Sequence, residues 1–244
     1  TQSDVISSSI IRHRKNRTDI LSDSLPAGVY AGGKLQNCVK RELIFPEYFG
    51  HFGILPSLCC KWIKREAAQS WQKRVPERVT LGEDAACCFP LIWSAERVCL
   101  TRDTYYHYET REDSMTRRSE GGEYKKAGLI LEYIGKLKEA FSQEELDLEK
   151  QEARYRLYLL KVVFEKELNL KIKGGWLTRF KEIEKQMAAL PANTFQAARL
   201  DQLHMTMEER SFFSCWEKGD WKGCCGWLLR IKIMQKTGKT GKKI

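Results

Sequence analysis

A change of hydrophobic periodicity at Gly121-Gly122 constrains the fold of this chain more than any other feature of its sequence. Before this glycine pair, short apolar segments are separated by turn signals such as Pro26-Ala27-Gly28 and Gly32-Gly33. After it, apolar residues recur at helical spacing, beginning with Leu129, Ile130, Tyr133, Ile134, Leu137 and Phe141. The sequence therefore predicts an α/β half over residues 1–121, a mostly α-helical region over residues 122–235, and a basic tail over residues 236–244.

Local patterns predict elements within both regions. Residues 4–12 are rich in β-branched side chains, which favours a strand, and a second strand is expected from Val98 into a tyrosine-rich segment. Aromatic residues and glycines over 45–56 indicate an irregular, partly buried segment. Helices are expected over 34–43, over 61–73 as a basic amphipathic helix, and over 84–97 with Pro90 inside; further helices are expected near 176–190, 195–203, 206–218 and 220–235.

Composition and charge limit the class of protein. Hydrophobic residues make up 42% and charged residues 30% of the 244 residues, which is typical of a globular protein. No apolar run approaches the roughly 20 residues that cross a bilayer. The net charge of +10 would attract anionic lipid or nucleic acid, or simply solvate a basic surface. No nucleic-acid recognition motif accompanies it, so we expect no nucleic-acid partner.

The nine cysteines are more typical of small core residues than of metal ligands. Six of them stand in adjacent pairs, and no Cys-x-x-Cys spacing occurs. Adjacent helical positions point about 100° apart and are poorly placed to bind one metal ion. We expect these thiols to be reduced, as in a cytoplasmic protein, and we expect no residue of this chain to bind a metal.

The segment Gly82-Glu83-Asp84 places two carboxylates at the start of a predicted apolar helix. A carboxylate in a partly apolar pocket can have its pKa raised towards working pH, which suits a general base. Gly82 can adopt dihedral angles that bring the backbone close to a ligand. Acidic residues also favour helix N-termini without any catalytic role, because the helix dipole stabilises them there. Spacing alone leaves both interpretations open.

Four segments in order resemble the C-terminal half of the catalytic domain of bacterial, inverting family 2 glycosyltransferases, over about residues 1–120. They are 25–30, 52–61, Thr80-Leu81-Gly82-Glu83-Asp84-Ala85-Ala86 with the Pro90-Leu91-Ile92 that follows, and the tyrosine-rich 105–117. The resemblance implies an incomplete, Rossmann-like GT-A fold of a nucleotide-diphospho-sugar transferase. It implies that Asp84 is the base that deprotonates the acceptor hydroxyl and that Glu83 helps to orient the acceptor.

The same resemblance implies substrate contacts elsewhere. Tyr106 and Tyr108 would offer aromatic platforms to sugar, and Lys61 would lie at the substrate. Arg111 and Ser114 match an Arg-x-x-Ser loop over the donor phosphates, where a guanidinium can bind a diphosphate in a bidentate way. This chain has Glu109 where many family members have an arginine, which weakens the match of the phosphate clamp.

The nucleotide-binding half of such enzymes, with its Asp-x-Asp motif, has no counterpart in this sequence. The resemblance therefore implies a fragment that is inactive alone, with the ligands of a divalent Mg²⁺ or Mn²⁺ ion outside this chain. The expected partners are a nucleotide sugar and a glycan acceptor of cell-surface polysaccharide synthesis. The expected location is the cytoplasm, at the inner face of the membrane.

A non-catalytic function is the alternative. A truncated relative could use its basic helical region to bind an anionic partner or a membrane surface. Tryptophans next to basic residues would suit either a membrane interface or a core, and we expect most of them in the core; they are Trp176, Trp216, Trp221 and Trp227.

Overall fold

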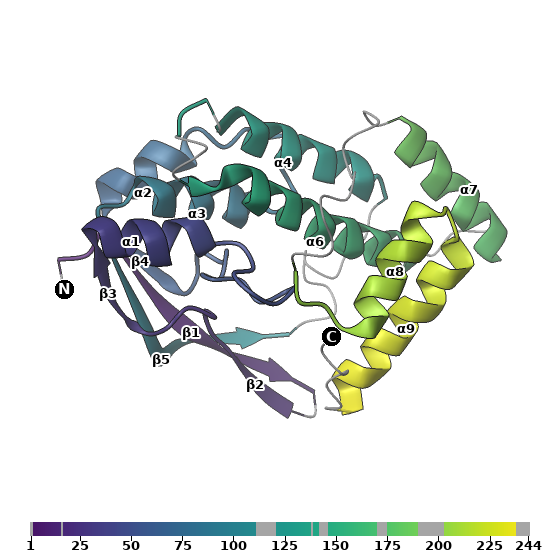
Figure 1. Cartoon of the computed structure of the whole chain (residues 1–244), viewed down its shortest axis with the longest axis horizontal. Coiled ribbons are helices and arrows are strands. Elements are labelled where there is room, and N and C mark those ends of the chain that lie inside the picture. The colour runs from purple at the N-terminus through teal and green to yellow at the C-terminus, as the bar shows by residue number, and fades with distance from the viewer. Residues whose placement is uncertain are drawn as a thin grey trace.

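The computed structural model describes residues 2–15, 17–110, 121–137, 139–141, 146–169, 175–189 and 203–237. It is an α/β structure in which a sheet lies at one end of the molecule and helices cover one side of it (Figure 1). The helices of the C-terminal part of the chain, residues 175–188, 207–217 and 221–237, gather at the opposite end. The predicted α/β class, with helices following a mixed first half, is confirmed.

The sheet is built around strand β1, which is the segment predicted from its β-branched residues. Its strands are β1 (Val5–Arg14), β2 (Arg17–Leu21), β3 (Gly28–Ala31), β4 (Lys61–Ile63) and β5 (Arg97–Glu109). The order is β2-β1-β5-β3, with β4 also paired to β1. Strands β1 and β5 run parallel, whereas the other three pairings are antiparallel. Val5, Val98 and Leu100 point into the core from the two parallel strands.

The helices of the first half differ from the sequence prediction at their ends. They are α1 (Gly32–Cys38), the short 3-10 helix η1 (Lys40–Glu42), α2 (Arg65–Gln72) and α3 (Glu83–Ser94). The helix predicted over 34–43 is interrupted at Val39, whose dihedral angles are not helical. The helix predicted over 61–73 is wrong at its start, because Lys61–Ile63 pairs with Val5–Ser7 as strand β4. Tertiary pairing overrides the helical pattern there.

The regular elements described in the second region are all helices, and outside them His204 forms an isolated bridge with Tyr48. Its helices are α4 (Glu123–Leu137), α6 (Leu148–Asn169), α7 (Gly175–Ala188), α8 (Met207–Glu217) and α9 (Trp221–Thr237). Most of the helix predicted over 195–203 lies outside the described residues. Helix α8 begins with a capping box, in which the Thr206 hydroxyl accepts from the Glu209 amide and the Glu209 carboxylate accepts from the Thr206 amide. Trp216 is buried, as expected for a core tryptophan.

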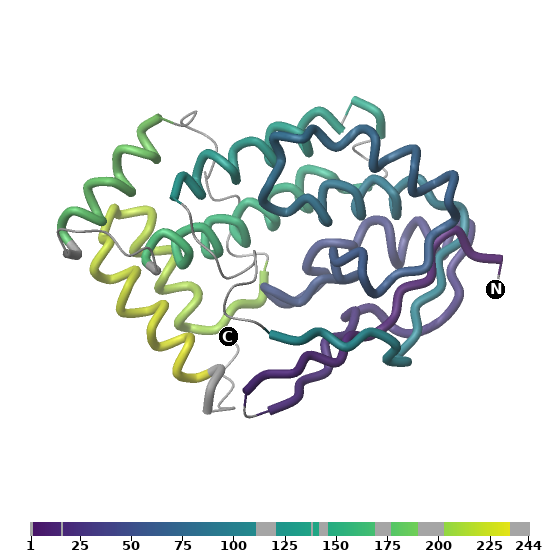
Figure 2. Tube along the Cα trace, turned by 180° about the vertical axis from the view of Figure 1, so that it is seen from behind, coloured from purple at the N-terminus to yellow at the C-terminus, as the bar shows by residue number. Residues whose placement is uncertain are grey.

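The two regions share one hydrophobic core. Buried residues of both halves belong to a single cluster, and aromatic pairs connect them. Phe89 of α3 packs edge-on against Tyr155 of α6 with ring centroids 5.2 Å apart, and Phe52 packs against Tyr158 at 5.1 Å. The helices after Gly122 therefore pack on the sheet-bearing half. Figure 2 shows that α1 and the segment after it lie between the strands of the sheet and the helices of the second region.

The irregular segment 40–56 is partly buried, and side chains of α6 form hydrogen bonds with its backbone. Gln151 is fully buried; its side-chain oxygen accepts from the Ile44 amide at 3.3 Å, and its nitrogen donates to the Lys40 carbonyl at 3.0 Å. Arg154 donates to the carbonyls of Phe45 and Pro46. Buried backbone groups need such partners, since an unpaired one costs about 1–3 kcal/mol. The helical region is thus part of the structure that lets this segment stay buried.

All nine cysteines are free thiols, and their burial is mixed. Cys60, Cys87, Cys88 and Cys224 are buried, whereas Cys38 and Cys59 are exposed. The expectation that the cysteines are core residues therefore holds for the buried ones and fails for the two exposed ones.

Among the described helices, none combines the length and the apolarity needed to cross a membrane.

Replacing Gln151 with leucine should lower the free energy of unfolding by about 2–4 kcal/mol, because it leaves the Ile44 amide and the Lys40 carbonyl buried without partners. Urea unfolding followed by circular dichroism measures the effect. The control is Gln69→Leu, at an exposed position of α2, which should change stability little. Equal stability of the two variants would mean that α6 does not support the segment.

Asp4 should make stability depend on pH. Partial burial acts to raise the pKa of Asp4, but hydrogen bonds from Lys64 and from the Arg97 and Glu96 amides outweigh it and hold the pKa below its usual value. Such a carboxylate stabilises the fold above the unfolded-state pKa of about 4, and this contribution is lost as pH falls through the folded-state value.

Asp4→Asn should therefore cost about 1 kcal/mol at pH 7, a modest value since solvent screens the site, and the cost should shrink towards pH 3. Thermal unfolding at both pH values tests this, with Glu77→Gln at an exposed position as the control. A deficit that stays constant with pH would contradict the assignment.

Candidate functional site

The turn before Glu83 and Asp84 can be formed only by glycine. Gly82 has φ of 73°, in the left-handed region that disfavours side chains. A Cβ atom there would also lie 2.7 Å from Ile130 Cδ1 and 2.8 Å from the Tyr155 hydroxyl oxygen. Both neighbours belong to the helical region, in α4 and α6. The start of α3, with its two carboxylates, is therefore seated directly on the second region.

The two carboxylates have different surroundings. Glu83 is exposed, and Asp84 is half-buried in the first turn of α3. Asp84 Oδ2 accepts a hydrogen bond from the Leu58 amide at 3.2 Å. In the described part of the chain, Asp84 Oδ1 has no hydrogen-bond partner, so it is the oxygen that could accept a proton from a ligand. The geometry fixes the orientation of Asp84 and leaves one lone-pair-bearing atom for chemistry.

The side chains of Asp23 and Lys61 hold the loop 55–58, whose Leu58 amide binds Asp84, in place. Asp23 Oδ1 accepts from the Leu55 amide at 2.7 Å, and Lys61 Nζ donates to the carbonyls of Leu55 and of Ser57, the latter at 2.9 Å. Asp23 is only 4% exposed. Lys61, predicted to contact substrate, thus has its ammonium group directed to protein carbonyls. We assign it to the support of the loop.

The ionisable side chains next to the loop 55–58 shift one another's pKa values. Burial raises the pKa of Asp23, and the attraction of Lys61 and the Leu55 amide opposes this without reversing it. Burial lowers the pKa of Lys61, but attraction to Cys88, Cys60 and Asp23 more than compensates and holds it above the usual value. A hydrogen bond from Cys59 and the charge of Lys61 outweigh burial and lower the pKa of Cys60 to about 7. Lys61 is the shared cation of this group.

An irregularity in β5 places a second cation at the same loop system. The register between β1 and β5 shifts between the pairs Ser7–Leu100 and Ser9–Thr104, so residues 101–103 bulge from the ladder. Arg102 lies in this bulge and donates to the carbonyls of Asp23 at 2.6 Å and Leu25 at 2.7 Å. The bulge therefore fixes the chain that carries Asp23.

The tyrosine-rich end of β5 is a sheet edge among the described strands. Strand β3 pairs only with residues 97–100 of β5, so residues 104–109 pair with β1 alone. Tyr106 is 38% exposed, Tyr108 is half-buried, and their spacing puts both on one face of the strand. This arrangement is suited to contact with a sugar ring, as predicted for these two residues.

His107, on the same edge, contacts His13 of β1. Its Nδ1 lies 2.8 Å from Nε2 of His13 on β1, and the two rings are stacked with centroids 5.1 Å apart. Arg111 and Ser114, predicted to contact the donor phosphates, lie outside the described residues. Their positions relative to Asp84 therefore stay a prediction.

The described residues contain no group of three or more histidine, cysteine, aspartate or glutamate side chains arranged to hold a metal ion.

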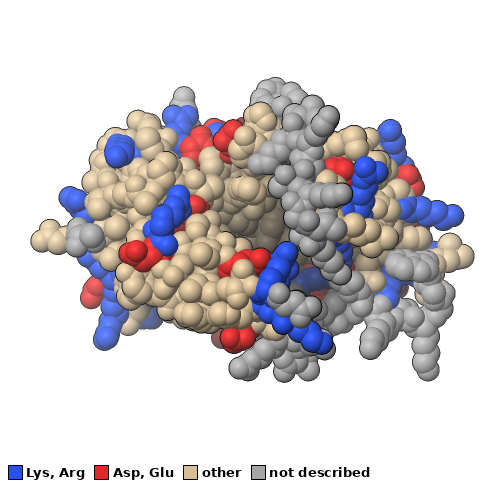
Figure 3. All heavy atoms as spheres, turned by 90° about the horizontal axis from the view of Figure 1, so that it is seen from below, with Lys and Arg blue, Asp and Glu red and all other residues tan. Residues whose placement is uncertain are grey.

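On the described part of the face seen from below, basic and acidic side chains are interspersed, and the blue side chains form no continuous patch (Figure 3). A continuous basic stripe would be the expected footprint of a nucleic-acid binder.

Comparisons with known proteins give a limited result. No protein-family model and no curated protein matches the chain. A solved structure that resembles it is that of S. aureus TarS (residues 1–349) in complex with UDP-GlcNAc, with a TM-score of 0.49 and 16% sequence identity. The match covers 97% of this chain and 60% of that chain, so this chain spans less than two-thirds of the matched protein. At this TM-score and identity, the likeness assigns neither an activity nor a substrate.

Sequence reasoning missed the residues that hold Asp84 in place. Asp23 is a single aspartate between serines, and Arg102 lies within β5 without any motif, so neither carries a spacing signal. The sequence indicates that Gly82 can adopt unusual dihedral angles, but its packing against Ile130 and Tyr155 depends on residues about 50 and 70 positions away. Long-range contacts of this kind leave no local pattern.

The Asp23–Lys61 pair can be tested by a double-mutant cycle. Lys61→Met should cost about 2–3 kcal/mol, because it removes two hydrogen bonds and leaves the buried Asp23 with Arg102 as its remaining nearby cation. Asp23→Asn in the same chain should recover about 1 kcal/mol or more of that loss. Lys125→Met, at an exposed position of α4, is the control.

Hydrogen exchange at the Leu58 amide gives a second readout for the same variants. Exchange should accelerate in Lys61→Met and stay unchanged in the control, since Leu58 is the donor to Asp84. If the stability losses of the two single variants add up in the double variant, and the exchange rate of the Leu58 amide does not change, Lys61 does not hold the loop 55–58 in place.

Proposed function

We propose that this chain is the acceptor-side part of an inverting glycosyltransferase that transfers sugar from a nucleotide sugar to a glycan acceptor. The proposal rests on the resemblance of the segments around Gly82-Glu83-Asp84, Phe52–Lys61 and the tyrosine-rich strand. The observation that supports it best is the placement of Asp84, which is oriented by the Leu58 amide and has a second oxygen without a partner among the described residues. A nucleotide-binding half outside these 244 residues would supply the donor.

In the proposed reaction, Asp84 acts as the general base. Its carboxylate accepts the proton of an acceptor hydroxyl while that oxygen attacks the anomeric carbon of the donor sugar. The bond between this carbon and the diphosphate oxygen breaks, the nucleoside diphosphate leaves with the electron pair, and attack from the opposite side inverts the configuration.

Other residues would bind rather than react. Glu83 would hydrogen-bond the acceptor, and Tyr106 and Tyr108 would pack against sugar rings at the β5 edge. Arg111 and Ser114 would contact the diphosphate and offset its charge as it leaves. Lys61 would act indirectly, by fixing the loop that orients Asp84.

A divalent Mg²⁺ or Mn²⁺ ion would neutralise the diphosphate in the complete enzyme, and its ligands would lie in the nucleotide-binding half. Among the described residues no group suited to hold a metal is found. The cell-surface polysaccharide acceptor and the position at the cytoplasmic membrane face are parts of the same proposal.

The decisive variant is Asp84→Asn in the protein that also contains the nucleotide-binding half. Asparagine keeps an oxygen for the Leu58 amide but cannot take a proton, so transfer should fall about 10²–10⁴-fold. Binding of the nucleotide sugar should be unchanged in a calorimetric titration. The titration compares several nucleotide sugars, with UDP-GlcNAc among them.

The matched control is Glu77→Gln, an exposed carboxylate that precedes the motif and should leave transfer unchanged. Full transfer activity in Asp84→Asn would remove the base from the mechanism. The alternative function, non-catalytic binding of an anionic partner, predicts no measurable transfer by the unaltered protein and no response of that binding to Asp84→Asn.

A further inference from the structure

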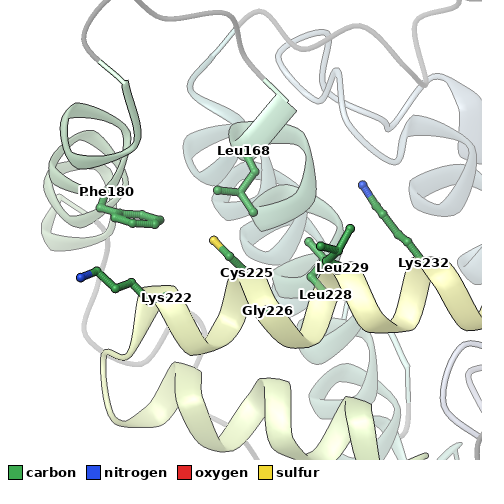
Figure 4. Close-up of a pocket in the computed structure, with 8 residues that line it drawn as sticks. All are labelled: Leu168, Phe180, Lys222, Cys225, Gly226, Leu228, Leu229 and Lys232. Atoms are coloured by element: carbon green, nitrogen blue, oxygen red, sulfur yellow. The ribbon is translucent and has the colours of Figure 1, made fainter.

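A pocket of about 590 Å³ lies between α6, α7 and α9, in the helical region that the proposed function does not use (Figure 4). Its volume is in the range of small-molecule sites. Leu168 of α6 and Phe180 of α7 face Cys225 and Leu229 of α9 across it. The lining side chains are apolar except for two lysines, Lys222 and Lys232, so the pocket is suited to hydrocarbon.

A glycine on α9 keeps this space open. Gly226 lies inside a 17-residue helix, where glycine costs about 0.5–1 kcal/mol relative to alanine. A Cβ atom at Gly226 would meet no neighbouring atom within 4 Å. By contrast, a Cβ atom at Gly223 would lie 2.2 Å from Asp220 Oδ2, so that position needs glycine for packing. At Gly226 the missing side chain serves no contact within the described structure and widens the pocket.

An apolar side chain at the pocket is left in water. Leu229 lines the pocket and is 60% exposed, and Ile233, one turn further along α9, is 52% exposed. Burial of a leucine side chain is worth about 1.5–3 kcal/mol. A hydrocarbon chain in the pocket would cover part of Leu229 and gain from this effect.

The two lysines differ in their pairing. Lys232 forms an ion pair with Glu165 of α6 at 2.8 Å. Lys222, in the first turn of α9, is exposed and has no ion-pair partner in the described part of the chain. The neighbouring Asp220 carboxylate accepts from the Gly223 amide at 2.9 Å, as a cap of α9. One cation at the pocket is therefore free to bind an anion.

We propose that this pocket binds a single-chain anionic amphiphile, with its hydrocarbon chain between α6, α7 and α9 and its carboxylate or phosphate head at Lys222. The site is separate from Asp84 and does not depend on the transferase proposal. The ligand chemistry could come from a membrane lipid or from a soluble acyl compound, and the experiment distinguishes the two sources.

The test is a calorimetric titration of the chain with dodecyl phosphate below its micelle concentration. The unaltered chain should bind one molecule, and Gly226→Leu should weaken binding at least about tenfold, because its side chain would occupy the pocket. Gly226→Leu should keep or raise the melting temperature, since leucine is the better helix former. Gly135→Leu is the matched control, in α4, where a Cβ atom also meets nothing within 4 Å.

Two further variants keep the proposal testable if Gly226→Leu disturbs the fold. Leu229→Asp puts a carboxylate at an exposed position of the wall and should abolish binding of the anion. Lys222→Gln should weaken dodecyl phosphate about five- to tenfold and leave dodecanol unaffected. Inorganic phosphate alone should bind far more weakly than dodecyl phosphate.

Vesicles separate the two sources. Co-sedimentation with phosphatidylglycerol vesicles that is lost in Gly226→Leu would identify a membrane lipid, whereas binding of dodecyl phosphate without co-sedimentation would identify a soluble amphiphile. The proposal is overturned if dodecyl phosphate does not saturate the chain or if Gly226→Leu binds it as tightly as the control. Equal affinity for dodecanol and dodecyl phosphate would overturn the assigned role of Lys222.

Discussion

The hydrogen bonds from α6 to the buried segment after α1 are the interactions on which the rest of the structure depends. Without Gln151 and Arg154, the amide of Ile44 and the carbonyls of Lys40, Phe45 and Pro46 would lose side-chain partners. That segment leads directly into the loop 55–58, whose Leu58 amide orients Asp84. The candidate base is therefore positioned through a series of contacts that begins in the helical region, far away in the sequence.

This dependence changes how the two halves should be regarded. Gly82 packs under Ile130 and Tyr155, and Phe89 of α3 packs on Tyr155, so the first turn of α3 has the second region as its support. The region after Gly122 serves the site structurally on this face, while its pocket at α9 offers a separate apolar surface.

The sequence predicts the elements whose signals are local. The β-branched run gives β1 and the apolar run after Glu83 gives α3, and helical periodicity gives α7, α8 and α9 within a few residues at each end, while most of the helix predicted over 195–203 lies outside the described residues. The sequence prediction fails for β4. The pattern of Lys61–Ile63 predicts a helix, but pairing with β1 holds these residues extended. The candidate carboxylates are found from their motif, but Asp23 and Gln151 are not, since their roles arise from partners 32 and 107 residues away. The contacts that position Asp84 therefore become visible only in the folded structure, because they join residues far apart in the sequence.

A structure of the complete protein with a nucleoside diphosphate and a glycan acceptor would test the central claim most directly. The account predicts an acceptor hydroxyl oxygen about 2.6–3.2 Å from Asp84 Oδ1, with the Leu58 amide still bonded to Oδ2. An acceptor bound elsewhere, with Asp84 facing no hydroxyl group, would contradict the account and leave Asp84 as a structural residue of the α3 turn.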